Sequence, residues 1–203
     1  MSKKPLIVFE GIEASGKSHH IKNIIRFLNK EGKNFIHIRE PGGNKNSEKI
    51  RKLILDNKST FNKNTDLLLY LSSRSENIEL IKKNYGKKII LIDRFVDSTI
   101  AYQHFGMGVN NKLIMTINNF LLKGININFT FLNLVSPKNM RERLIKRKKL
   151  NRYDQFNASF YKRVQDGYIK ICKKNPKKYM KINSNLNITD NEITILNKIK
   201  ELI

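Results

Sequence analysis

The stretch LIVFEGIEASGKS, residues 6–18, joins an apolar run to a glycine-containing turn. Gly11, Gly16, Lys17 and Ser18 fit the spacing G-x-x-x-x-G-K-[ST]. Glycines let the backbone turn so that successive N–H groups point at one anion, and a helix that follows adds the positive end of its dipole. We therefore predict that residues 11–18 bind nucleotide phosphates, with Lys17 at the outer phosphates and the Ser18 hydroxyl on Mg²⁺.

The surroundings of this loop favour a phosphate site over an ordinary turn. Leu6 to Phe9 have the composition of a buried parallel strand. Beyond Lys17, isoleucines and a leucine recur on one helical face, at Ile21, Ile24, Ile25 and Leu28. The resulting order of strand, loop and helix is the one that a phosphate-binding loop requires.

The whole chain of 203 residues continues this alternation and suits one domain. Strands are predicted at 6–9, 35–39, 89–93, 129–134 and 179–182. Helices are predicted at about 17–31, 45–56, 65–84, 97–104, 111–123, 137–147, 155–173 and 189–202. Strands that alternate with helices pair in parallel through right-handed crossovers, so we expect an α/β fold in three layers, with ligands at the carboxyl ends of the strands.

Composition excludes several classes of protein. Cys172 is the single cysteine, so an internal disulfide and a multi-cysteine metal site are excluded, and the four histidines lack metal-ligand spacing. The sequence has no apolar stretch near the roughly 20 residues that span a bilayer and no signal-peptide pattern, so we expect no membrane contact and a cytoplasmic location.

The formal net charge of +23 raises the alternative of a nucleic-acid-binding protein. The lysines are spread along the chain among many asparagines and isoleucines, as expected from A+T-rich coding DNA. We therefore expect no specific nucleic-acid partner.

Three further segments fall where a strand ends or a helix begins. In REPGG, residues 39–43, Pro41 and the two glycines form either a plain turn or a close approach of backbone to ligand. Arg51 is an anion clamp or a surface charge. Tyr70 and Arg74 share one helical face, either as a stack and donor for a base or as a core tyrosine beside an unrelated arginine.

The third segment is IILIDRFVDSTIAYQ, residues 89–103. Asp93 ends an apolar strand, where it would hold Mg²⁺ opposite the phosphate loop or serve as a helix cap, and Arg94 would clamp a second anion. Thr99 and Tyr102 are expected to point the same way from a helix. Farther on, residues 141–152 carry seven basic residues and one acidic residue, which form a solvated face or a flap that closes over phosphates.

Together these residues resemble the thymidylate kinase family, specifically the bacterial type. FEGIEASGKS resembles its phosphate loop, REPGG the bacterial motif after the second strand, and DRFVDSTIAYQ its DR-x-x-x-S-x-x-A-Y motif. The resemblance implies a P-loop NTPase-type fold with a five-stranded parallel sheet, a basic lid at about residues 141–154, and a homodimer. It also implies ATP-dependent phosphorylation of dTMP with Mg²⁺.

The resemblance also implies roles for individual residues. The ATP phosphates are expected on Gly11, Ile12, Glu13, Ala14, Ser15, Gly16, Lys17 and Ser18. The dTMP site is expected to comprise Glu13, Pro41, Arg51, Tyr70, Arg74, Arg94, Ser98, Thr99, Tyr102 and Gln103. The residues expected to take part in catalysis are Lys17, Asp93, Arg94, Arg147 and Arg152. Mg²⁺ is expected to bind Ser18 and Asp93.

The sequence departs from the family at four positions. Tyr70 replaces the usual phenylalanine, His104 and Phe105 replace glycines, and Asn151 replaces an acidic residue that would orient a lid arginine. Two other functions remain open at this point: a nucleotide kinase with another base preference, and a P-loop ATPase that acts on nucleic acid.

Overall fold

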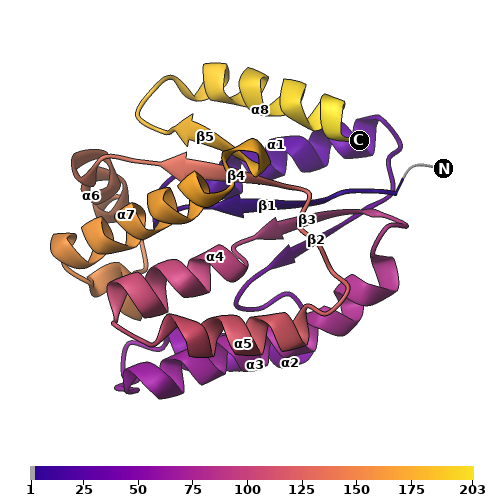
Figure 1. The fold of residues 1–203 in the computed structure, drawn as a ribbon. Helices are drawn as coiled ribbons and strands as arrows, with labels where there is room; N and C mark the ends of the chain where they lie inside the picture. Colours follow the sequence, from indigo (N-terminus) through magenta and orange to yellow (C-terminus); the bar gives the residue numbers. More distant parts are fainter. Residues whose placement is uncertain (1–2) are drawn as a thin grey trace.

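One parallel sheet organises the protein, whose computed structural model describes residues 3–203 (Figure 1). Its strands are β1 (Leu6–Glu10), β2 (Phe35–Arg39), β3 (Ile89–Asp93), β4 (Phe129–Leu134) and β5 (Tyr179–Asn183). They lie in the order β2-β3-β1-β4-β5, and every pair is parallel. The predicted α/β fold with a five-stranded parallel sheet is confirmed.

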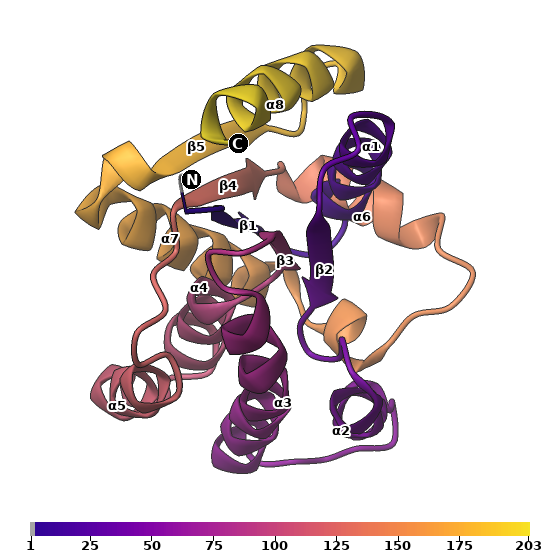
Figure 2. The ribbon, with the colours of Figure 1, turned by 90° about the vertical axis from the view of Figure 1, so that its right-hand side faces the viewer.

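Helices follow the strands and cover both faces of the sheet (Figure 2). The α-helices are α1 (Lys17–Lys30), α2 (Lys45–Leu55), α3 (Lys63–Asn84), α4 (Val96–Thr99), α5 (Asn111–Leu121), α6 (Pro137–Ile145), α7 (Ala158–Lys174) and α8 (Ile188–Leu202). The other helical segments are the π-helix η1 (Ile100–Gly106) and the 3-10 helices η2 (Arg152–Gln155) and η3 (Pro176–Lys178). Among residues 3–203, no helix has the length and apolarity needed to cross a bilayer.

Alternation along β1 divides the core into two layers. Ile7 and Phe9 pack on one face with α1 and α8, whereas Leu6 and Val8 pack on the other face with residues of α3 such as Ile78. All four strand side chains are at most 1% exposed, as expected of a central parallel strand that is buried on both faces. The carboxyl end of β1 is thereby fixed between two packed layers.

Two predicted helices differ from the structure. The α-helix expected at 97–104 is a short α4 followed by the π-helix η1, whose wider turn ends where the Met107 N–H donates to the Tyr102 carbonyl at 2.9 Å. The helix expected from residue 155 begins at Ala158, because the Asn157 side chain accepts the Phe160 N–H at 2.9 Å and caps it. Residues 152–155 form the separate turn η2.

The π-helix packs closely on α7 through two glycines. A Cβ atom on Gly167 would lie 2.5 Å from Phe105 Cδ2, and one on Gly106 would lie 2.7 Å from Phe160 Cε2. The large side chain at position 105 is therefore accommodated by the absence of a side chain at position 167. This contact holds η1, which carries Tyr102 and Gln103, against α7.

We expect Gly167→Ala to lower the free energy of unfolding by about 1–3 kcal/mol, because the added methyl overpacks the Phe105 ring. At a helix position with free space around the glycine, the same substitution raises the free energy of unfolding by about 0.5–1 kcal/mol. The sign of the change in the free energy of unfolding therefore tests whether the methyl group meets the ring. Urea denaturation of the single variant and of Gly167→Ala/Phe105→Ala measures it. Stabilisation by Gly167→Ala, or a loss that Phe105→Ala leaves unrelieved, would contradict the contact.

Candidate active site

Parallel pairing of β1 with β3 brings two functional loops together. Phe9 lies opposite Asp93 in the register, and the Arg94 N–H donates to the Phe9 carbonyl at 2.9 Å. The loop that follows β1 therefore lies beside the residues that follow β3. This is the carboxyl edge of the sheet, where the topology predicts the ligand.

The loop at residues 11–16 has the backbone that its glycines allow. Gly11 has a φ of +138°, and a Cβ there would lie 2.3 Å from the Asn133 carbonyl oxygen. Gly16, with a φ of +88°, is the N-cap residue directly before α1. A side chain at Gly11 would clash, and one at Gly16 would be strained by its positive φ.

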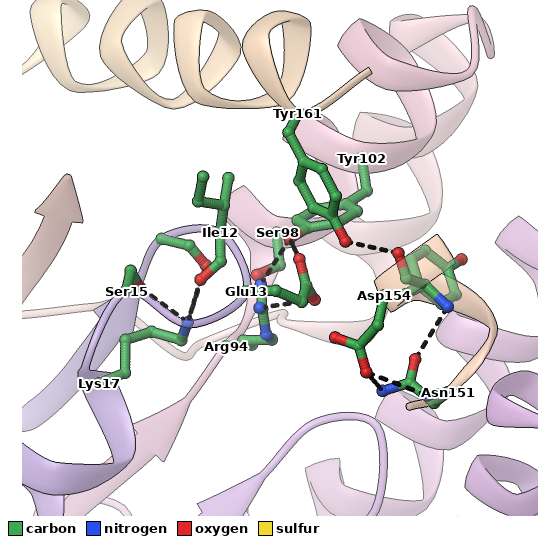
Figure 3. A network of polar contacts seen from close by, with 12 residues as sticks. Ile12, Glu13, Ser15, Lys17, Arg94, Ser98, Tyr102, Asn151, Asp154 and Tyr161 are labelled. Carbon is green, nitrogen blue, oxygen red and sulfur yellow. Dashed lines mark hydrogen bonds and ion pairs between the residues drawn. The ribbon is translucent and has the colours of Figure 1, made fainter. Parts of the chain in front are cut away.

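Lys17 folds back over this loop (Figure 3). Its Nζ donates to the carbonyls of Gly11 and Ile12, each at 2.9 Å, and to Ser15 Oγ at 3.2 Å. Burial and then the charge of Arg94 lower the pKa of Lys17 to about 7. An anionic ligand at the loop would favour the charged ammonium.

A cavity of about 550 Å³ extends from this loop across the edge of the sheet. Most of the predicted site residues line it: Glu13, Ala14, Ser15, Gly16, Lys17, Ser18, Pro41, Arg51, Tyr70, Asp93, Arg94, Ser98, Tyr102, Gln103 and Arg147. We call this cavity the main pocket. Its size suits small-molecule ligands.

At the middle of the main pocket, Glu13, Arg94 and Tyr102 form one cluster (Figure 3). Arg94 Nη2 donates to Glu13 Oε1 at 2.9 Å, and the Tyr102 hydroxyl donates to Glu13 Oε2. Burial opposes ionisation of Glu13, but the charges of Arg94 and Lys17 outweigh it and hold its pKa below the ordinary value. Arg94 has a φ of +67°, a left-handed conformation that is uncommon for a side-chain-bearing residue.

Oxygen atoms beside the phosphate loop fit a magnesium ion. Ser18 Oγ lies 3.3 Å from Asp93 Oδ2, and Asp93 Oδ1 is buried without a hydrogen-bond partner among residues 3–203. In the same described range, no three His, Cys, Asp or Glu side chains gather around a common metal position. A hard cation held mainly by phosphates and water suits this sparse oxygen set.

Two predicted base-binding residues are more deeply buried. Arg74 is 1% exposed; its Nε donates to Glu40 at 2.8 Å and its Nη1 to Asn118 at 2.6 Å. Thr99 is also 1% exposed, and its hydroxyl has no partner within residues 3–203. Neither side chain lines the main pocket, whereas Tyr102 does.

The basic segment places its arginines in different surroundings. Arg143 and Arg147 line the main pocket, whereas the Arg152 guanidinium binds the buried carboxylate of Asp66 on α3. Arg147 Nη1 donates to Asp154 Oδ1 at 2.7 Å. Asp154 therefore supplies the acidic partner that position 151 lacks.

Sequence reasoning missed two residues that shape the site. Glu10 is fully buried; its carboxylate accepts the Phe95 N–H at 2.8 Å, the Ser98 hydroxyl at 2.5 Å and the Tyr168 hydroxyl at 3.1 Å. Tyr153 lines the main pocket from the basic segment. The sequence offered one signal for each residue. Glu10 is a carboxylate at the end of an apolar strand, and Tyr153 is an aromatic residue at the end of the basic segment.

Comparison with known proteins agrees with this geometry. The family model described as thymidylate kinase matches residues 9–195. A thymidylate kinase of Kosmotoga olearia is 33% identical over 188 residues, covering 90% of this chain and 88% of that protein. One of Thermosipho africanus is 38% identical over 169 residues, covering 82% and 84%.

A solved structure is similar over nearly the whole fold. The thymidylate kinase of Ehrlichia chaffeensis superimposes with a TM-score of 0.78 and 28% sequence identity, covering 98% of this chain and 99% of the other. The match of residues 9–195, the identities and this superposition lead to one conclusion. The chain belongs to the thymidylate kinase family, and its motifs are those of the bacterial type.

Proposed function

We propose that the protein transfers the γ-phosphate of ATP to dTMP and releases dTDP, a step in dTTP synthesis for DNA. The observation that carries this proposal is the single pocket that joins the phosphate loop at Lys17 to an aromatic and arginine-lined region at Tyr70, Arg51 and Arg94. One cavity with two such ends can hold donor and acceptor phosphates in contact. Phosphoryl transfer needs that positioning more than it needs covalent chemistry from the protein.

The donor end is formed by residues 11–18. Backbone N–H groups of the loop and the amino end of α1 attract the ATP phosphates, and Lys17 exchanges the loop carbonyls for the outer phosphates. Ser18 and Asp93 hold Mg²⁺, with Asp93 acting directly or through water. When bound, Mg²⁺ neutralises charge that develops on the phosphates.

The acceptor end is formed by residues from four segments. Arg51 and Arg94 hold the dTMP phosphate, Glu13 lies at the sugar, and Tyr70 stacks on thymine. Pro41, Ser98, Tyr102 and Gln103 complete the wall. We propose that Arg74 and Thr99 recognise the edge of the base from the protein interior. The Thr99 hydroxyl has no hydrogen-bond partner within residues 3–203, which supports this role.

Arg147, like Arg143, is a lid arginine that lines the main pocket, but the Arg143 guanidinium is held by the carbonyls of Ala14 and Ser184. We propose that Arg147 stabilises charge on the transferring phosphoryl group. Arg152 would have to break its ion pair with Asp66 to stabilise charge on the same phosphoryl group.

A homodimer and a cytoplasmic location remain proposals. Leu68 on α3, with Leu113 and Phe120 on α5, are apolar side chains that are 55%, 46% and 79% exposed. Burial of these side chains against a second copy would remove them from water. Light scattering on the purified protein measures the assembly, and cell fractionation measures the location.

The base preference tests the proposed function. We expect dTMP to have a higher kcat/KM than dUMP, UMP, CMP, dGMP and AMP when ATP and Mg²⁺ are present and nucleoside diphosphate is quantified by chromatography. A higher kcat/KM for another nucleotide would assign the site to a different monophosphate kinase. ATP hydrolysis stimulated by nucleic acid, with no diphosphate product, would assign it to a different class.

We expect Lys17→Met to abolish turnover, by at least about 10³-fold, because no other cation replaces the ammonium at the outer phosphates. The folded-state pKa of about 7 lies below the unfolded value near 10.5, so the unfolded chain binds more protons between these values. The contribution of Lys17 to stability therefore rises with pH across this window, by up to about 4 kcal/mol.

Urea denaturation at pH 7 and pH 10 checks that sign. The stability of Lys17→Met relative to the wild type should be highest at pH 7 and decline toward pH 10. Near-normal turnover would refute the role of Lys17 at the phosphates. A stability difference that stays constant with pH would refute the lowered pKa.

We expect Tyr102→Ala to reduce the preference for dTMP over ribothymidine monophosphate, because the ring occupies the space where a 2′-hydroxyl would project. That preference should be about 10 to 100-fold in the wild type, the cost of burying a hydroxyl without a partner. Tyr102→Phe keeps the ring and should keep most of the preference. The measurement is the ratio of kcat/KM values in all three proteins, and a ratio that Tyr102→Ala leaves unchanged would place the selectivity elsewhere.

A further inference from the structure

We propose that Asp66 is a positioning residue that anchors the carboxyl-terminal end of the lid segment, residues 141–154, and thereby fixes Arg147 over the main pocket. The role of Arg147 in this inference rests on the proposed function. The anchoring itself concerns only contacts between α3 and the lid segment.

Asp66 is a buried carboxylate that holds two side chains of the lid segment. It is 1% exposed, and its two oxygens accept separately from the Arg152 guanidinium and the Tyr153 hydroxyl. Its own N–H donates to the Asn62 carbonyl at 3.0 Å within the first turn of α3. Removing one partner of a buried ion pair leaves the other charge uncompensated, so a substitution that removes the Asp66 charge is costly to this contact.

The anchored turn leads directly to Arg147. The Asn151 N–H donates to Asp154 Oδ2 at 3.0 Å (Figure 3), and the Tyr153 N–H donates to Asn151 Oδ1 at 2.8 Å, which closes η2 as a capping box. The other oxygen of Asp154 accepts from Arg147. Asp66 thus acts on Arg147 through a rigid turn.

The same anchor adjoins the acceptor end of the main pocket. The Tyr153 ring meets Tyr70 and Tyr102 edge-on, with centroids 5.8 Å apart in each case. Asp66 and Tyr70 lie one turn apart on α3, so one rigid helix carries both the lid anchor and the proposed thymine stack. Loss of the anchor should therefore affect catalysis more than it affects dTMP binding.

Asp97 offers a matched control. It is also a buried aspartate that accepts a tyrosine hydroxyl, from Tyr179 at 2.8 Å, but it lies on α4 and contacts β5 instead of the lid segment. Burial, then the charge of Glu10, raises the pKa of Asp97 to about 7, so an asparagine resembles the protonated form that is populated at neutral pH.

The test compares wild type, Asp66→Asn and Asp97→Asn in limited trypsin digestion, with cleavage after the exposed Lys148 and Lys149 followed by mass spectrometry. We expect Asp66→Asn to accelerate this cleavage about tenfold or more, because the population of the open segment rises as its anchor is lost. Asp97→Asn should cleave there at the wild-type rate. Asp66→Glu should restore part of the protection.

Steady-state kinetics supply the second measurement. In Asp66→Asn we expect kcat to fall about tenfold, with a change in the KM for dTMP of less than about threefold, since Arg147 loses its orientation while the thymine stack remains. A double-mutant cycle with Arg152→Gln, scored by trypsin cleavage, should show that the double variant is no more open than the more open single variant.

Wild-type cleavage and wild-type kcat in Asp66→Asn, with only a lower melting temperature, would overturn the proposal and leave Asp66 a stabilising residue. Additive effects in the cycle would also overturn it. If Asp66→Asn does not fold, Arg152→Gln alone carries the cleavage prediction. Absence of dTMP phosphorylation in the wild type would refute the proposed function but would leave the cleavage result interpretable, because proteolysis needs no turnover.

Discussion

The register between β1 and β3 is the constraint on which the site depends. With Phe9 opposite Asp93, the phosphate loop after β1 lies against the Asp93–Arg94 pair after β3. A shift by one residue would exchange the two faces of β1 and move Glu13 away from Arg94. Both strands are buried on two faces, so such a shift would also disrupt the packing of both layers.

Local sequence signals were sufficient for the sheet and the phosphate loop. Runs of four to six residues rich in apolar side chains marked the strands, and the glycines at positions 11 and 16 occupy backbone conformations that their motif requires. Most predicted site residues line one pocket, because they follow strands whose carboxyl ends meet at one edge.

Side-chain pairing across distant segments was not predictable in the same way. Arg74 was predicted to bind the base and Arg152 to take part in catalysis, but the buried carboxylates of Glu40 and Asp66 bind their guanidinium groups. The π-helix packs on α7 at Gly106 and Gly167, a contact between distant segments that local periodicity does not encode. Arg147 finds its acidic partner at Asp154, three positions beyond the expected one.

The net charge of +23 would attract polyanions whatever the function of the protein. It therefore discriminates poorly between a kinase and an ATPase that acts on nucleic acid. Direct transfer between two ligands in one pocket is the central claim. Its sharpest test is a single turnover with γ-labelled ATP, excess enzyme, Mg²⁺ and dTMP. The account predicts label in dTDP with almost none in inorganic phosphate. Label released mainly as inorganic phosphate would contradict it.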